Sequence, residues 1–176
     1  LTFGIIGFLD DYMKITQRTS KGLPGKLKFL MQVVISIVAT LYIMSQMPTD
    51  LATIIAIPFL KSAVINFGWM FVGFAVLVMV GASNAVNLTD GLDGLAIMPV
   101  MIAGGALGII AYVVGRTDFT EYLDVHYVAG TGEILIFCSA LLGAGLGFLC
   151  YNAPPAAVFM GDTGSLALGG RLRATV

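Results

Sequence analysis

Four long runs of uncharged, mostly apolar residues constrain this chain more than any other feature of its sequence. The runs cover residues 29–49, 62–89, 94–115 and 134–161. Each is long enough for the ~20 residues that a helix needs to cross the hydrocarbon core of a bilayer. Only 11% of the residues are charged, whereas a typical soluble domain has about 25%. The sequence therefore predicts an all-α polytopic membrane protein with four complete transmembrane helices.

Two shorter apolar runs lie at the ends of the sequence. Residues 1–9 would form about 14 Å of helix, and residues 163–170 begin a similar run. We expect both to be truncated transmembrane helices, so that residues 1–170 form a partial transmembrane domain of a larger protein. The final residues, 171–176, carry Arg171 and Arg173, which would enter hydrocarbon if the last helix continued. They are interpreted as an atypical tail and a candidate boundary artefact.

The distribution of charge predicts the orientation in the membrane. Five of the nine basic residues lie in one short connection within residues 14–28, and such an excess marks the cytoplasmic side. Alternating spans then place residues 50–67 and 116–133 outside. The acidic residues that we expect at or near cytoplasmic helix ends are Asp10, Asp11, Asp90, Asp93 and Asp162. The net charge of −1 gives no case for a nucleic-acid partner.

The two outside connections have different compositions. β-branched residues on both sides of Pro58 predict two short strands, which we expect to form a small β-hairpin on the outer membrane surface. The second connection carries Asp118, Glu121, Asp124 and His126. One histidine among scattered acids is more typical of a solvated surface than of a metal site, whose ligands must converge on one point.

The segment NAVNLTDGLDGLA, Asn84 to Ala96, places Asn84, Asn87, Asp90 and Asp93 at every third position after a long apolar run. An ionisable side chain at membrane depth costs roughly 2.5 to 3.5 kcal/mol on insertion scales and usually serves metal, proton or substrate handling. The alternative interpretation is a polar cytoplasmic turn that carries two acids.

The residue types favour a particular chemistry. Carboxylates with several lysines favour a hard cation such as Mg²⁺, which is typically held by one or two carboxylates together with substrate phosphates. Asp10 and Asp11 are neighbours, so their side chains would diverge by about 100° on a helix and should have unequal roles. The alternative for this pair is a solvated cap at the membrane interface.

Three motifs, FLDDYMK (Phe8 to Lys14), NAVNLTDGLDGLA and FMGDTGSLALGG (Phe159 to Gly170), resemble those of the phospho-N-acetylmuramoyl-pentapeptide transferase family, within the polyprenyl-phosphate N-acetylhexosamine-1-phosphate transferase superfamily. The resemblance spans essentially the whole chain, with the motifs in the family's order. It implies Mg²⁺-dependent transfer of phospho-MurNAc-pentapeptide from UDP-MurNAc-pentapeptide to undecaprenyl phosphate, which yields lipid I and UMP. It also implies a location in the bacterial inner membrane, with the active site on the cytoplasmic face, and a full-length homodimer.

The resemblance also implies roles for individual residues. Asp162 corresponds to the Mg²⁺ ligand, and Asp10, with Asp11 beside it, to the group that deprotonates or orients the lipid phosphate. Lys14 and Lys26 would be phosphate partners, although lysines in a cytoplasmic loop have an equally good topological explanation.

Five further positions are implied to bind the donor substrate. Asn87, Asp90 and Asp93 would line the nucleotide and diphosphate side of the site. Phe159 would stack on uracil, and Asn152 would lie near the same pocket.

The sequence also departs from the family pattern. The family's histidine-rich cytoplasmic motif and its first helices are absent from these residues, and RLRATV replaces an expected apolar continuation. We therefore expect these 176 residues to be inactive alone. Two alternatives remain open: a related UDP-N-acetylglucosamine transferase of the same superfamily, and a transporter-type helical bundle, in which intramembrane acids also serve.

Overall fold

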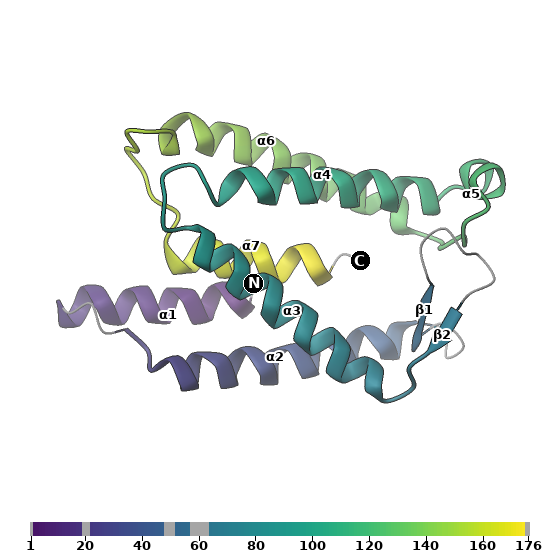
Figure 1. Cartoon of the computed structure of the whole chain (residues 1–176), viewed down its shortest axis with the longest axis horizontal. Helices are drawn as coiled ribbons and strands as arrows, with labels where there is room; N and C mark the ends of the chain where they lie inside the picture. The colour runs from purple at the N-terminus through teal and green to yellow at the C-terminus, as the bar shows by residue number, and fades with distance from the viewer. Residues whose placement is uncertain (1, 19–21, 48–51, 57–63, 175–176) are drawn as a thin grey trace.

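The computed structural model describes residues 2–18, 22–47, 52–56 and 64–174. It is mostly helical, as predicted (Figure 1). The elements, in chain order, are α1 (Thr2–Gln17), α2 (Gly25–Gln46), β1 (Ile54–Ala56), β2 (Val64–Asn66), α3 (Met70–Thr89), α4 (Ile97–Val114), α5 (Thr117–Leu123), the 3-10 turn η1 (Thr131–Glu133), α6 (Ile134–Asn152) and α7 (Gly161–Ala174).

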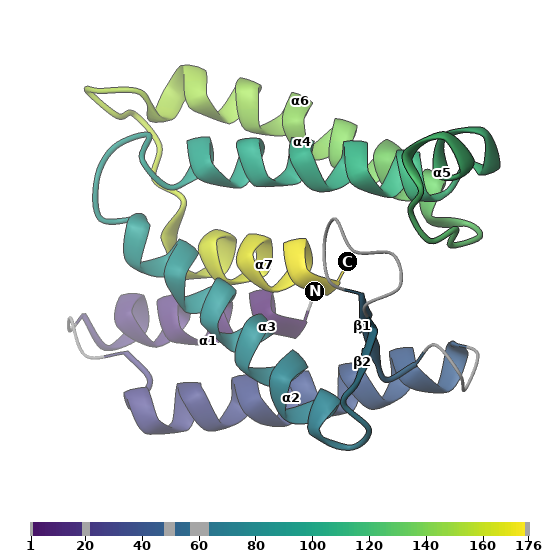
Figure 2. The same cartoon turned by 45° about the vertical axis from the view of Figure 1, so that its right-hand side comes forward.

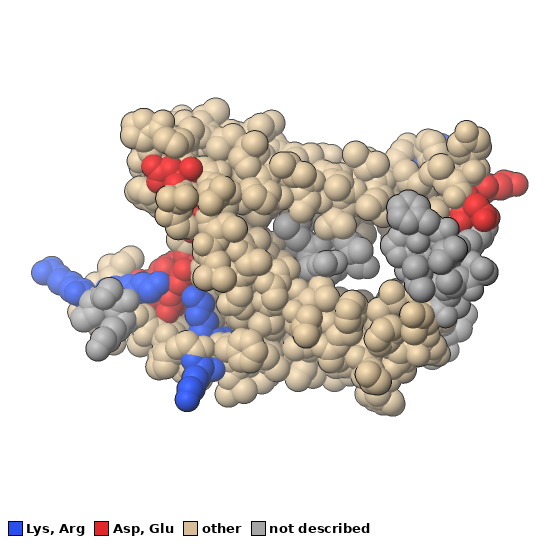
Figure 3. All heavy atoms as spheres, in the orientation of Figure 1, with Lys and Arg blue, Asp and Glu red and all other residues tan. Residues whose placement is uncertain are grey.

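Four helical segments are long and apolar enough to cross a membrane, which confirms the predicted number of spans. They are α2 with 22 residues, α3 with 20, α4 with 18, and η1 with α6 as one segment of 22 residues. On the face drawn in Figure 3, the acidic and basic side chains of the described residues gather toward the two ends of the molecule.

The connections alternate between these two ends. The α1–α2, α3–α4 and α6–α7 connections lie at the left end in Figure 1, and the β1–β2 hairpin and α5 lie at the right end. The three acid-bearing motifs therefore share one end of the molecule. Their location on the cytoplasmic side of a membrane stays a prediction.

The hairpin confirms the predicted strands. β1 and β2 pair antiparallel, with Ile55 opposite Ile65, and the hydroxyl of Thr53 donates to the side-chain oxygen of Asn66 over 2.9 Å. Pro58, on which the prediction was centred, lies outside the described residues.

The first helix is longer than the nine apolar residues predicted, and Asp10 and Asp11, which were predicted at or near its end, lie about two turns before that end. α1 continues from Thr2 to Gln17, so both acids lie within it. The helix can continue because Lys14 pairs with Asp10 at i,i+4 spacing, an arrangement that supports helices. At the other end of the chain, α7 continues past residue 170 through Arg171; the proposed boundary at 170/171 stays a prediction.

Small residues bring α7 into close contact with α1 and α3 (Figure 2). A Cβ on Gly7 of α1 would collide with the backbone of Asp162, and one on Gly169 of α7 with the backbone of Ser83 on α3. The hydroxyl of Ser83, which is fully buried, donates to the carbonyl of Leu166 over 3.1 Å. Close approach through small residues is typical of membrane helices, and here it holds the start of α7 beside the acids of α1.

Apolar contacts among α1, α2 and α7 stabilise this arrangement. Phe3, Ile6 and Leu166 form a buried cluster, and Met31 and Ile35 of α2 pack against it. α4 and α6 form a separate pair, in which Gly108 lies against Cys138 and Gly145 against Met101.

Candidate active site

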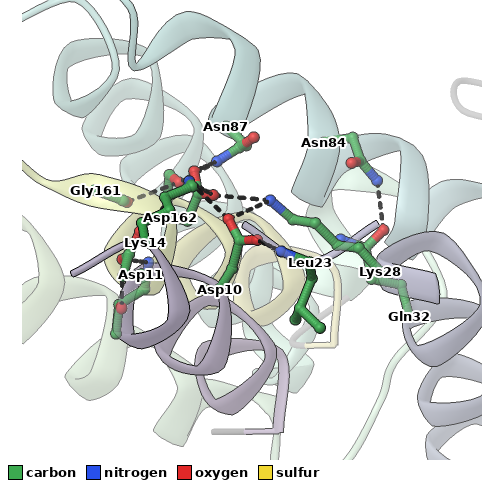
Figure 4. Close-up of polar contacts among 12 residues, drawn as sticks. Asp10, Asp11, Lys14, Leu23, Lys28, Gln32, Asn84, Asn87, Gly161 and Asp162 are labelled. Carbon is green, nitrogen blue, oxygen red and sulfur yellow. Dashed lines mark hydrogen bonds and ion pairs between the residues drawn. The ribbon is translucent and has the colours of Figure 1, made fainter. Parts of the chain in front are cut away.

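The structure brings together three acids that are far apart in the sequence. Asp10 and Asp11 come from α1 and Asp162 from the first turn of α7 (Figure 4). Their nearest carboxylate oxygens lie within 4.8 Å of one another. Asp10 is buried, and the other two are half-buried.

Two lysines neutralise this cluster. Lys14 Nζ lies 2.7 Å from Asp10 Oδ2, 2.8 Å from Asp162 Oδ2 and 3.8 Å from Asp11 Oδ1. Lys28, from the start of α2, lies 2.9 Å from Asp162 Oδ2 and 3.7 Å from Asp10 Oδ2. The two ammonium groups thus meet at the same oxygen of Asp162, and the carboxylates still outnumber them.

The other oxygen of Asp162 is held from α3. Asn87 Nδ2 donates to Asp162 Oδ1 over 2.6 Å and to Ser165 Oγ over 2.9 Å. Ser165 is buried and donates in turn to the carbonyl of Gly161 over 3.0 Å. Asp162 therefore accepts hydrogen bonds from α1, α2 and α3, which fixes the orientation of its carboxylate.

The neighbouring acids of α1 have unequal environments. Asp10 accepts a hydrogen bond from the backbone amide of Leu23, in the connection to α2. Asp11 Oδ2 accepts from both the backbone amide and the hydroxyl of Thr163, over 3.0 and 2.8 Å. Asp11 thus caps the N-terminus of α7 from another helix, where free amide groups and the helix dipole favour an anion.

Asp90 and Asp93 both lie in the connection between α3 and α4 but have different environments. Asp90 is half-buried and follows the last residue of α3. Burial raises the pKa of the Asp90 carboxyl above its usual range, the nearby Asp162 and Asp11 add to this effect, and a hydrogen bond from the Gly161 backbone opposes it. Asp93 is exposed and accepts a hydrogen bond from the amide of Ala156 over 3.2 Å.

Asn152 and Phe159 lie outside the acid cluster. Asn152 is buried and joins two loops, because its Oδ1 accepts from the amide of Gly94 over 2.9 Å and its Nδ2 donates to the carbonyl of Val158 over 2.8 Å. Phe159 is 72% exposed in the loop before α7. Its side chain is therefore accessible to a ligand.

The lysine of α2 that reaches the acids is Lys28, which was not selected from the sequence as a site residue; Lys26, which was, is exposed. A signal for Lys28 was present in the sequence. Lys28, Gln32, Ser36 and Thr40 recur at four-residue spacing in an otherwise apolar helix, and residues four apart share one helix face. Gln32, Ser36 and Thr40 are all buried.

The donor set of the cluster suits a hard cation. Among the described residues, Asp10, Asp11 and Asp162 are the only group of three metal-ligating side chains that lies close enough to share an ion. All three offer carboxylate oxygens, which are the ligands that Mg²⁺ prefers.

An apolar groove lies beside the cluster, between α2 and α3. It extends toward the opposite end of the molecule and ends near the site at Asn84, one turn before Asn87 on α3. The groove is lined by Phe29, Val33, Gly73, Val76, Leu77, Val80, Gly81 and Asn84.

Comparison with known proteins agrees with this geometry. All of the chain, residues 1–176, matches the model of the family described as glycosyl transferase family 4. Three curated relatives named phospho-N-acetylmuramoyl-pentapeptide-transferase are similar over 174 residues. They are from Ruegeria sp. (strain TM1040), at 64% identity, Ruegeria pomeroyi, at 62%, and Dinoroseobacter shibae, at 59%. Each alignment covers 99% of this chain and 48% of the relative, so the chain spans about half the length of the curated relatives that it matches.

Proposed function

The chain belongs to glycosyl transferase family 4, and we propose that it carries the catalytic centre of an enzyme that transfers phospho-MurNAc-pentapeptide from UDP-MurNAc-pentapeptide to undecaprenyl phosphate. The products would be lipid I and UMP. The observation that carries this proposal is the convergence of Asp10, Asp11 and Asp162 with two lysines at one end of apolar helices. The relatives' name, at 59–64% identity, supports the choice of substrates.

The carboxylate of Asp162 would hold Mg²⁺. The carboxylates of Asp10 and Asp11 lie close enough to contact the same ion. The cation, when bound, supplies charge neutralisation for the diphosphate of the donor. Asn87 donates to one oxygen of Asp162 and two lysines contact the other, so the cation would take the place of an ammonium group at that second oxygen. These partners hold the carboxylate in one orientation before any substrate arrives.

Asp10 would deprotonate or orient the phosphate of the lipid acceptor. An oxygen of that phosphate attacks the phosphorus next to the sugar, a new P–O bond forms, and the bond to the UMP oxygen breaks. Lys14 and Lys28 would neutralise the charge that spreads over the transferring group, which is the main task in phosphoryl transfer. Lys26 would be a further phosphate partner, since its exposed side chain is accessible to a substrate.

Asn87, Asp90 and Asp93 would line the nucleotide and diphosphate side of the site. Phe159 would stack on the uracil, and its exposure supports this role. Asn152 would act close by, since it holds the loop that carries Phe159 through the carbonyl of Val158.

The lipid substrate would reach the site from the bilayer. The apolar groove between α2 and α3 ends at Asn84, one turn before Asn87, and its apolar lining supports an acceptor with a long apolar chain. The setting that we propose is the bacterial inner membrane, with the site on the cytoplasmic face and the intact enzyme as a homodimer.

UMP release tests this proposal. The intact enzyme that carries this chain would be purified in detergent and supplied with UDP-MurNAc-pentapeptide, undecaprenyl phosphate and Mg²⁺. We expect release of UMP that falls by several orders of magnitude in Asp162→Asn, because an amide keeps the shape but removes the charge that holds the cation. Asp118→Asn, at the opposite end, is the matched control and should retain activity. Release with UDP-N-acetylglucosamine alone as donor would instead identify the related transferase, and near-normal activity of Asp162→Asn would contradict the assigned metal ligand.

A further inference from the structure

Two amide side chains, the buried Gln32 and the half-buried Asn84, lie one helical turn from the lysine and the asparagine that contact Asp162. Asn84 Nδ2 on α3 donates to Gln32 Oε1 on α2 over 2.7 Å and to the carbonyl of Val80 over 2.8 Å (Figure 4). Gln32 is fully buried. Among the described residues, this is the only side-chain hydrogen bond between α2 and α3.

The pair is costly to maintain. Gln32 Nε2 is buried and has no hydrogen-bond partner among the described residues, and a buried donor without a partner destabilises a fold. Methionine, which is similar in length and apolar, would avoid this cost. The presence of glutamine therefore points to a role other than stability.

We infer that Gln32 and Asn84 form a positioning pair that holds Lys28 and Asn87 against Asp162. The inference rests on the proposed function, because it concerns the same site. Neither amide touches the reacting groups. Their effect is exerted through the two residues that do contact Asp162.

The spacing along both helices supports this role. Lys28 and Gln32 are four residues apart on α2, and Asn84 and Asn87 are three apart on α3, so each pair shares one helix face. The Gln32–Asn84 hydrogen bond joins α2 to α3. One turn away on the same two helices, Lys28 and Asn87 contact Asp162. Lys28 Nζ lies 2.9 Å from one oxygen of Asp162, and Asn87 Nδ2 lies 2.6 Å from the other.

The packing of the helices explains why Lys28 needs such support. α7, which carries Asp162, packs against α1 and α3, whereas α2 packs mainly against α3. Lys28 therefore reaches Asp162 from a helix that is placed chiefly through α3. The register of α2 on α3 decides where its ammonium group lies, and a single buried polar contact is an established way to set the register of apolar helices.

Steady-state kinetics and thermal unfolding of Gln32→Met, in the intact enzyme, separate positioning from stability. We expect an unchanged or higher thermal midpoint, a kcat that falls by about 10- to 100-fold, and a KM for the UDP substrate within about threefold of the parent value. Thr40→Val, at a buried polar position about two turns further along α2, is the control and should keep the parent kcat. A midpoint and a kcat that fall together, or an unchanged kcat, would overturn the inference.

Exchanging the two amides provides a rescue experiment. Gln32→Asn and Asn84→Gln alter the reach of the pair when made singly, and both should lower kcat. The double variant restores the summed length of the two side chains and should recover most of the parent kcat. Losses that merely multiply in the double variant would show that the two amides act independently.

Lysine reactivity tests the inference without transferase activity. Lys28 is half-buried and ion-paired, with 16% of its side chain exposed, so brief acetylation should modify it slowly, and mass spectrometry measures the extent of modification. In Gln32→Met its modification should increase several-fold, whereas Lys14, which is held by α1 and α7, should be unaffected. If the parent enzyme releases no UMP, the proposed function fails, and this measurement still decides the positioning role. Unchanged modification of Lys28 would overturn that role whatever the activity.

Discussion

The two ends of the molecule carry similar side chains but arrange them differently. At one end, Asp10, Asp11 and Asp162 are buried or half-buried and converge to within 4.8 Å. At the other end, Asp118 and its partner Arg116 are exposed and pair over 2.8 Å at the surface.

Burial and convergence distinguish these two ends, whereas composition does not. The exposed Arg116–Asp118 ion pair contributes little to stability in water. The Arg116 guanidinium also contacts the ring of Tyr112, 5.4 Å from its centre. The three acids near α7 instead converge on one point and share two lysines. Among the described residues, three carboxylates close enough to share a cation occur only at that end.

The largest expected contrast is an all-or-none difference in access from the two sides of the membrane. In a background with Cys138→Ala and Cys150→Ala, a membrane-impermeant thiol reagent applied outside intact cells should modify Glu121→Cys and leave Phe159→Cys unmodified. Both residues are exposed in the structure, so burial cannot explain a difference. Modification of both from the same side would contradict the two-sided arrangement of the connections.

The spans and the hairpin could be predicted from the sequence because each depends on local composition. An uncharged run of about 20 residues has few stable alternatives to a membrane helix. The β-branched residues around Pro58 favour extended backbone in the same local way, and β1 and β2 lie there.

The identity of the second lysine was missed, because it depends on how α2 is rotated about its axis, and the abundance of basic residues in this connection carries no information on that rotation; only the four-residue spacing of polar residues along α2 does. Lys26 and Lys28 are two residues apart and point about 200° apart around a helix. The face that α2 presents is decided by its packing on α3 and on the cluster of Phe3, Ile6 and Leu166. The convergence of Asp10 with Asp162 likewise depends on tertiary packing, because α7 must lie against α1 to bring the two residues together.

Removing one positive charge at each end of the molecule should affect the activity of the enzyme unequally. Lys28→Gln should lower kcat/KM by about 100-fold, because it removes one of two ammonium groups that neutralise the transferring phosphate, a loss of about 2.7 kcal/mol of transition-state stabilisation. Arg116→Gln should change kcat/KM by less than about threefold. Lys26→Gln should lower kcat/KM by less than Lys28→Gln does, because the Lys26 side chain is exposed whereas Lys28 contacts Asp162, and UMP release measures all three. A loss in Lys26→Gln as large as that in Lys28→Gln would show that proximity to the acids does not determine the effect.

The smallest expected effect is a difference in how stability depends on pH. The pKa of Asp90 is raised, mainly by burial, so its protonated form is favoured by folding, and the stability that it contributes is lost as pH rises through the folded-state pKa. The pKa of Asp118 is lowered by its hydrogen bond with Arg116, so its contribution is present above the ordinary pKa and is lost as pH falls through the folded-state value. At neutral pH, Asp90→Asn should therefore raise the thermal midpoint slightly, and Asp118→Asn should lower it or leave it unchanged, since salt screens an exposed pair. Both differences should shrink on acidification, and thermal unfolding in detergent between about pH 4 and pH 8 would measure them across the usual carboxyl range. Shifts of the same sign for the two variants at neutral pH would show that burial does not separate the acids at the two ends.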